Sequence, residues 1–351
     1  MPSLTLTLET VTPLLMNGAD QTPEIRAASF RGVLRYWLRA VLGGIYQGDI
    51  GELKKEESRY FGSTEAGSPL RVRVEHSLSA WDSSANDYLK HSVLPPRFEF
   101  PGYQTKQQFS LIFDTHPLHR GENVFTQAFY AALLLAFNLG AFGKRARRGG
   151  GALRIIEASG DFLTDDVKSL LEYEPLDGKD LQNFIQGKLL PYAERAQRSS
   201  YQAQHAYGKN SIPAYPIFTP EHVKILIGKP SQDYLAALRS FWKPTQDYHR
   251  LPQRDKNGQI ITNNQRHPRL KKWAWGYAIG SDRRASALHV RVQHLQDGFY
   301  PVVTIFHSSG VDDQGRPKRE DWSTIQTVID SLVPQVFMSI NWHNSDRIVW
   351  Q

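Results

Sequence analysis

Residues 12–40 carry a strand end, a glycine-containing loop and an arginine-rich helix in immediate succession. Upstream, residues 4–8 alternate leucine with threonine, which is the period of a half-buried strand. Downstream, residues 30–45 repeat apolar side chains at helical spacing, so we expect a helix with one buried face that ends at Gly43 and Gly44. This order places backbone amides and guanidinium groups on one surface, where they suit a polyanion.

The loop and the helix start form a candidate phosphate-binding wall. Arg31, Arg35 and Arg39 recur every four residues and therefore share one edge of the helix. Ser29 is the expected N-cap, and residues 16–23 run from a strand end to a helix start, where free amides can donate to phosphate. The candidate residues are Asn17, Gly18, Arg26, Ser29, Arg31, Arg35 and Arg39. The alternative is a solvated, salt-bridged helix edge beside an ordinary loop.

Strand and helix patterns alternate in the first half of the chain. Further strands are predicted at residues 70–76, 97–100, 108–113 and 152–156, and a second, very apolar helix at residues 123–139. This order of strand, helix, strands, helix, strand is that of a ferredoxin-like or RRM-like sheet with helices on one face.

The second half repeats this order more faintly. We predict a hairpin from residues 288–295 and 300–306, helices at 181–198, 232–241 and 322–332, and a last strand at 336–340. The repetition indicates an internal duplication, so the predicted fold class is α+β, with two ferredoxin-like (RRM-like) βαββαβ domains packed side by side. We place the domains at residues 1–160 and 161–351, because acidic residues cluster between 157 and 180.

The charge balance favours an anionic partner, since 42 Lys and Arg oppose 35 Asp and Glu, for a net charge of +7. A basic insertion at residues 243–272 is either a solvated loop or a segment that orders on a nucleic-acid backbone. The chain has no cysteine, which excludes disulfides, thiolate metal sites and cysteine nucleophiles and favours a reducing cytoplasm. Without a signal-peptide pattern or a bilayer-length apolar run, we expect a soluble, unexported protein with no membrane contact.

A second basic segment, GAFGKRARRGGGALR, occupies residues 140–154. Its five cations have no acid among them, and its glycines remove side chains, so a sugar-phosphate chain can approach the backbone closely. The cations are Lys144, Arg145, Arg147, Arg148 and Arg154, and the candidate contact residues are Gly143, Lys144, Arg145, Arg147, Arg148, Gly149 and Gly150. The segment lacks the Walker spacing and follows a helix rather than a strand, so it matches neither common nucleotide motif. The alternative is a flexible surface turn.

Together, TPLLMNGAD and EIRAASFRGVLRYWLRA near the start and AFGKRARRGGG in the middle resemble the RAMP proteins of CRISPR effector complexes. The greatest likeness is to the first-numbered RAMP subunit of the type III-B, or Cmr, complex. The glycine-rich loop keeps the family spacing, but Ala141 replaces a glycine and Gly150 replaces an apolar residue. The resemblance covers roughly the first 155 residues, and beyond them it rests on RRASALHVRV and the hairpin.

The resemblance implies paired ferredoxin-like domains that bind guide RNA (crRNA), or its duplex with target RNA, by backbone contacts near the guide's 3′ end. It implies other RAMP subunits of the effector complex as partners and a role in antiviral defence. We expect no cofactor. The two basic segments are then two walls of one RNA groove, with Arg26, Arg31 and Arg35 opposite residues 144–148.

Asp20 keeps an enzymatic alternative open, because related RAMP subunits cut target RNA with a divalent metal through an aspartate in this loop. A lone carboxylate is a poor metal site, however, and an aspartate here more often forms a cap or turn. We therefore predict a binding subunit without a metal, with endoribonuclease activity as the alternative.

A guide-processing ribonuclease is a second enzymatic alternative, with a histidine as general acid or base. His116 and His119 are the only close pair, and they are expected to be surface residues. The sequence lacks the Gly-x-Ser-x-Gly and His-Glu-x-x-His motifs of serine and zinc hydrolases.

Overall fold

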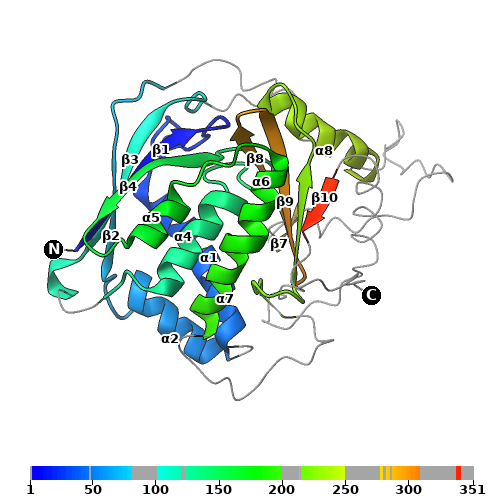
Figure 1. The fold of residues 1–351 in the computed structure, drawn as a ribbon. Helices are drawn as coiled ribbons and strands as arrows, with labels where there is room; N and C mark the ends of the chain where they lie inside the picture. The colour runs from blue at the N-terminus through cyan, green and yellow to red at the C-terminus, as the bar shows by residue number, and fades with distance from the viewer. Residues whose placement is uncertain are drawn as a thin grey trace.

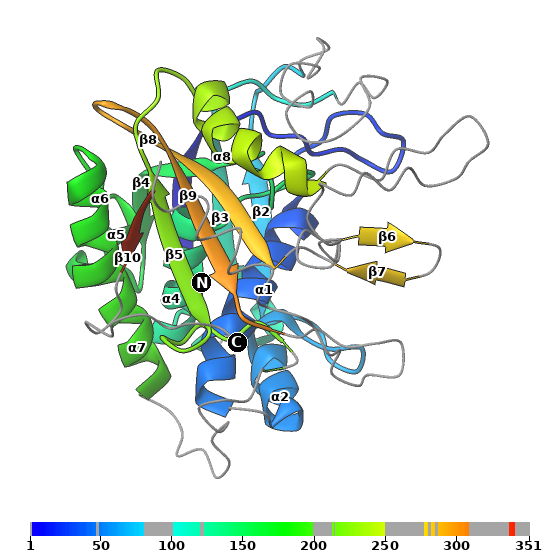
Figure 2. The same ribbon diagram turned by 90° about the vertical axis from the view of Figure 1, so that its right-hand side faces the viewer.

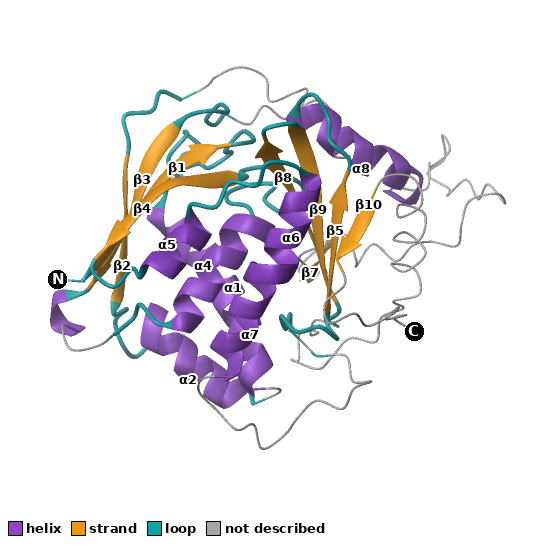
Figure 3. Cartoon of the chain, in the orientation of Figure 1, coloured by secondary structure: helices purple, strands orange, loops and turns teal. Residues whose placement is uncertain are grey.

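Two four-stranded antiparallel sheets flank a group of helices (Figures 1 and 3). The computed structural model describes residues 2–46, 49–80, 101–119, 123–198, 213, 215–249, 277–279, 282–284, 287–308 and 337–340. A single hydrophobic core joins both sheets through the helices between them. The protein therefore has the α+β composition predicted from its sequence.

The first sheet has the strand order β2-β3-β1-β4. It contains β1 (Ser3–Thr10), β2 (Leu70–Glu75), β3 (Gln108–Thr115) and β4 (Leu153–Gly160), which confirms four predicted strands. Leu4, Leu6 and Leu8 of β1 are buried, whereas Thr5 and Thr7 are half-buried, as the alternation predicts. The strand predicted at 97–100 lies outside the described residues.

Helix α1 (Ala27–Tyr46) begins earlier and ends later than predicted. Ser29 is not its N-cap, because the Ser29 amide already lies in the first turn and donates to the carbonyl of Arg26. Gly43 and Gly44 lie inside the last turns rather than ending the helix. A Cβ at Gly43 would lie 2.9 Å from the ring of Tyr215, so the glycine permits close packing of a neighbouring segment.

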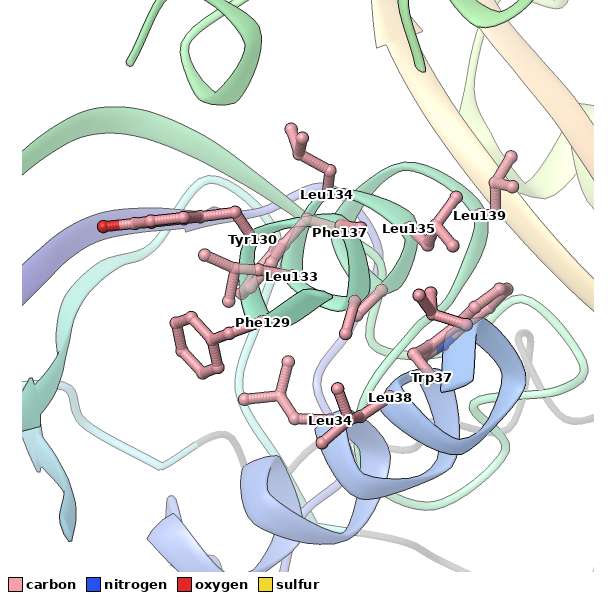
Figure 4. Close-up of a cluster of buried hydrophobic side chains, with 14 of the residues drawn as sticks. Leu34, Trp37, Leu38, Phe129, Tyr130, Leu133, Leu134, Leu135, Phe137 and Leu139 are labelled. Carbon is pink, nitrogen blue, oxygen red and sulfur yellow. The ribbon is translucent and has the colours of Figure 1, made fainter. Parts of the chain in front are cut away.

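Helices α1 and α4 (Gln127–Leu139) pack face to face between the sheets (Figure 4). Leu34, Trp37 and Leu38 of α1 point toward the leucines and phenylalanines of α4, and all are buried. Thr126 caps α4, three residues after its predicted start. Each such side chain contributes about 1.5–3 kcal/mol on burial, so this contact is a major part of the core.

Several helices surround this pair. Helix α2 (Ile50–Phe61), which the sequence reading missed, packs on α1 and is capped by Asp49. The predicted helix at 181–198 is a continuous run of α6 (Gly178–Phe184), a π-helical turn (Ile185–Leu189) and α7 (Leu190–Arg198). Helix α5 (Asp165–Leu171) precedes it and packs on β4, while α7 packs on α1 and α4.

The second sheet has the order β10-β5-β9-β8, which repeats the order of the first. Its strands are β5 (Val223–Gly228), β8 (Leu288–Leu295), β9 (Gly298–Phe306) and β10 (Phe337–Ile340). The predicted hairpin and last strand are confirmed, whereas β5 was not predicted. In both sheets the first strand lies between the third and the fourth, which supports the inferred duplication.

Helix α8 (Tyr234–His249) covers the outer side of the second sheet. It confirms the helix predicted at 232–241 but runs further, so the basic stretch at 243–272 begins as helix rather than loop. Residues 250–276 and the predicted helix at 322–332 lie outside the described residues.

Two short elements complete the chain. Strands β6 (Tyr277–Ile279) and β7 (Asp282–Arg284) pair as a separate ribbon (Figure 2), and Pro117–His119 forms a 3₁₀ turn. Within the described part of the chain, every helix is too short or too polar to cross a bilayer.

Candidate nucleic-acid interface

A groove of about 630 Å³ separates helix α1 from the glycine-rich loop that joins α4 to β4. Apolar and polar side chains line it together, and among them are four basic ones, two from α1 and two from the loop. The predicted residues that it brings together are Asn17, Ser29, Arg35, Arg39, Gly143, Lys144 and Arg147. The two predicted walls therefore face the same space.

Seven predicted residues do not line this groove: Gly18, Arg26, Arg31, Arg145, Arg148, Gly149 and Gly150. Arg26 lies at the end of the preceding loop, where its Nε is 3.9 Å from a carboxylate oxygen of Glu24. Only part of each predicted wall faces the groove directly.

The loop after β1 closes on itself as a tight turn. Asn17 pairs with Pro23, the amide of Gly18 donates to the carbonyl of Thr22 at 2.8 Å, and the Asn17 side-chain amide donates to the carbonyl of Gln21. The expectation that Gly18 offers a free amide to phosphate is therefore wrong, because the turn itself uses that amide. The Lys144 ammonium donates to the Gln21 side-chain oxygen at 2.9 Å and ties this turn to the opposite wall.

Asp20 stabilises that turn. One of its carboxylate oxygens accepts from the amide and the hydroxyl of Thr22, at 3.0 and 2.7 Å. These hydrogen bonds lower the pKa of Asp20, which is exposed. Among the described residues, no three His, Asp or Glu side chains gather in an arrangement that could hold a metal ion.

The arginines of α1 are engaged by helix α2. Arg31 and Arg35 each donate to the carbonyl of Phe61 at 2.9 Å, at the C-terminus of α2, where unpaired carbonyls and the helix dipole favour cations. Arg35 and Arg39 also pair with the buried carboxylate of Glu57. Arg31, Arg35 and Arg39 thus form a salt-bridged helix edge, which is the alternative considered from the sequence. Arg35 and Arg39 nevertheless line the groove.

The glycines of the loop allow it to pack closely against its own protein, and they do not expose its backbone to a ligand. Gly143, Gly149 and Gly151 have φ of 81°, 92° and 65°, which side chains rarely adopt. A Cβ at Gly143 would lie 2.6 Å from the carbonyl oxygen of Leu15, and one at Gly151 would overlap that of Phe142. Gly149 and Gly150 are buried, so their backbone is not open to a ligand as the sequence predicts.

Backbone hydrogen bonds fix the loop beside β1. The amide of Lys144 donates to the carbonyl of Leu15 at 2.6 Å, and that of Gly151 donates to the carbonyl of Pro13 at 2.9 Å. The Thr12 hydroxyl donates to the carbonyl of Gly149 at 2.8 Å. The glycine-rich loop is therefore fixed against β1 and the segment after it, and it is not the flexible surface turn considered as an alternative from the sequence.

The loop cations differ in their surroundings. The Arg147 guanidinium lies 4.8 Å from the centre of the Tyr36 ring, a cation–π contact. Burial lowers the pKa of Arg148, and Arg145 is half-buried with φ of 64°. Arg154 pairs with Glu9 and Glu174, so it is removed from the predicted basic cluster.

Comparison with known proteins agrees with the resemblance seen in the sequence. The family model of the RAMP superfamily matches residues 7–154. The CRISPR system Cmr subunit Cmr1-2 of Pyrococcus furiosus is 35% identical over 177 residues, which cover 42% of this chain and 92% of that relative. This chain belongs to the RAMP superfamily. Cmr1-1 of the same organism is 28% identical over 178 residues, covering 48% of this chain and 51% of its own.

Solved RAMP structures share the fold over nearly the whole chain. The crystal structure of apo Cmr1 from Pyrococcus furiosus matches with a TM-score of 0.61 and 18% identity, over 97% of this chain and 99% of that one. A chain in a cryo-EM structure of the type III-B Cmr-beta complex bound to cognate target RNA matches with a TM-score of 0.63 and 13% identity, over 95% and 99%.

Two groove residues of this RAMP protein were not singled out as site residues from sequence. Tyr36 lies between Arg147 and His289 in the groove, and its hydroxyl shares a 2.9 Å hydrogen bond with His289 Nε2. Burial raises the pKa of Tyr36 to about 12 and lowers that of His289 well below its ordinary value. For His289, the sequence did offer a signal: polar side chains stand at alternate positions of LHVRVQHL, residues 288–295.

Proposed function

We propose that this protein is an RNA-binding subunit of a type III-B (Cmr) CRISPR effector complex in antiviral defence. It holds guide RNA, or the guide–target duplex, through the sugar-phosphate backbone and contacts other RAMP subunits of that complex. The observation that carries this proposal is the groove in which basic residues of α1 and of the glycine-rich loop face each other. The relationship to a Cmr1 subunit, and the target RNA in the matched cryo-EM complex, support RNA as the polyanion.

Backbone recognition follows from the groups that line the groove. Lys144, Arg147, Arg35 and Arg39 are cations, which neutralise phosphates without reading base edges. On the α1 side, Arg35 and Arg39 pair with one buried carboxylate, that of Glu57, while Arg31 donates to the carbonyl of Phe61, so this wall keeps a positive charge despite its ion pairs. Sequence reading is then left to base pairing between guide and target.

We propose that the chain folds as two ferredoxin-like domains packed side by side, at residues 1–160 and 161–351. The strand order of both sheets supports this division. Helices α5 and α7 belong to the second range but pack with helices of the first, so the two units share one core.

Binding rather than cleavage is the proposed activity. The carboxylate of Asp20 is committed to the turn through Thr22, which supports a turn-forming role. His116 and His119 lie outside the groove, with ring centres 6.0 Å apart. Neither observation favours a ribonuclease as a second function.

Equilibrium binding of fluorescent single-stranded RNA tests the proposal. The loop variant replaces four cations with alanine: Lys144, Arg145, Arg147 and Arg148. A control variant removes four exposed cations outside the groove: Lys179, Lys188, Arg195 and Lys229. We expect the loop variant to weaken binding by about 100-fold in about 0.1 M salt, equally for two RNAs of unrelated sequence.

The control variant should bind within about twofold of wild type, because phosphate contacts act locally. Equal affinities for the loop variant and wild type would remove the loop from the site and overturn the proposed function.

A further inference from the structure

Strand β8 of the second half presents polar side chains to the first half. At alternate positions, His289 hydrogen-bonds the Tyr36 hydroxyl, the Arg291 Nη1 donates to the carbonyl of Gly140 at 2.7 Å, and the Gln293 side-chain amide donates to the carbonyl of Asn138 at 3.0 Å. All three side chains are buried. A strand face that points into a core is normally apolar. These three polar side chains therefore need hydrogen-bond partners, and residues of the first half provide them.

Arg291 joins the two ends of the glycine-rich loop. Its guanidinium also donates through Nη2 to the carbonyl of Leu153 at 2.5 Å, the residue with which β4 begins, whereas Gly140 follows the last residue of α4. The side chain is 1% exposed. One buried group therefore sets the distance between the residues from which the loop departs and to which it returns.

The charge of Arg291 is balanced without an acid. Among the described residues it has no carboxylate partner, and burial lowers its pKa to about 9, so it stays protonated at neutral pH. The carbonyls near the end of α4 lack helical partners and carry the negative end of the helix dipole. Burying a cation without a carboxylate is costly, but an apolar residue there would leave the carbonyls of Gly140 and Leu153 unsatisfied.

The same strand also holds the basic middle of the loop. The amide of Val290 donates to the carbonyl of Arg147 at 3.3 Å, and Arg148 forms a parallel bridge with Val290. Leu238 of α8 lies against Gly149, where a Cβ would overlap it. The second half thus contacts both ends and the centre of the basic loop.

We infer that Arg291 is a positioning residue for RNA binding: it sets the loop so that Lys144 and Arg147 line the groove, without itself contacting RNA. This inference rests on the proposed function of the loop. It makes the groove a composite of the two halves, with β8 as the element that couples them.

A double-mutant cycle in the full chain tests this inference. Arg291→Met alone is expected to weaken RNA binding about tenfold and to reduce its salt dependence. In the loop variant, Arg291→Met should change affinity less than about twofold, because the groups that it positions are already gone. Arg291→Lys keeps the charge but loses the fork that spans two carbonyls, so its affinity should be intermediate. Arg195→Met, on the exposed face of α7, is the matched control and should bind like wild type.

The outcomes separate the two proposals. An equal loss from Arg291→Met in both backgrounds, or no loss from either Arg291 variant while the loop variant binds weakly, would overturn the positioning role. If Arg291→Met fails to fold, judged by thermal unfolding, the cycle is carried out with Arg291→Lys and the same criteria apply. Full affinity of the loop variant itself would refute the proposed function instead.

Discussion

Glu57 is buried beneath two arginines that line the groove, Arg35 and Arg39. Its carboxylate lets α1 and α2 approach while the groove edge keeps its positive charge, because Arg31, Arg35 and Arg39 outnumber it. Its role is therefore to hold the wall in place rather than to contact RNA.

Glu57→Gln is expected to destabilise the protein by about 1–3 kcal/mol, because it leaves half-buried guanidinium groups without their counter-charge, with a discount for the exposure of the arginines. Urea unfolding measures this loss. RNA affinity of the folded variant should not fall, since a negative charge has been removed from the groove edge. A large loss of affinity with unchanged stability would contradict this assignment.

Asp20→Asn should leave RNA binding unchanged and lower stability at neutral pH. Because the folded-state pKa of Asp20 lies below its ordinary value of 3.8, its contribution is present above that pH and is lost as the pH falls through the folded pKa. Denaturation of wild type and variant at several pH values measures the difference, which should disappear in acid. Loss of a metal-dependent RNA cut by the purified complex on Asp20→Asn would favour the enzymatic alternative.

At the level of elements, the glycine-rich loop depends on residues with left-handed backbone. Gly151 has a φ of 65°, and a Cβ added to it would overlap the carbonyl oxygen of Phe142. Gly151→Ala is expected to cost at least about 1–3 kcal/mol and to weaken RNA binding by displacing the loop. Gly67, where a Cβ would meet nothing within 4 Å, provides the control alanine variant, expected to match wild type in thermal unfolding and RNA affinity. Equal behaviour of the two variants would contradict the packing role.

Helices and strands with a strong hydrophobic period were predictable from the sequence, whereas the elements against which they pack were not. The alternation of β1 and the helical spacing of α1 identify both elements, because each reflects one buried face. Helix α2 was missed although Asp49 marks its start, since only Leu53, Tyr60 and Phe61 give it a buried apolar stripe. The pairing of the α1 arginines with Glu57 depends on how α2 docks, which no local pattern encodes.

The glycines illustrate the same limit for the site. Their clustering with cations correctly located the loop, but sequence alone does not show that Gly143 and Gly151 face protein carbonyls rather than a ligand. His289 and Arg291 were not predicted as groove and positioning residues because their roles arise from contact between segments about 150 residues or more apart.

Across the whole molecule, Trp37 joins the two halves. Its ring lies 6.2 Å from that of Phe218 and 5.6 Å from that of Phe306 in β9, while its helix packs on α4 (Figure 4). Trp37→Ala should cost about 3–5 kcal/mol. Because the core is shared, urea unfolding should remain one transition by fluorescence and circular dichroism. Two separated transitions in wild type would contradict a common core.

The decisive measurement for RNA binding by this groove is the slope of log affinity against log salt concentration, for one single-stranded RNA with wild type and the loop variant. If all four loop cations contact phosphates, the wild-type slope should be steeper by about 2.8, and by less if the half-buried arginines contribute only partly. The control variant should keep the wild-type slope. Parallel lines for wild type and the loop variant would show that RNA does not bind through this loop.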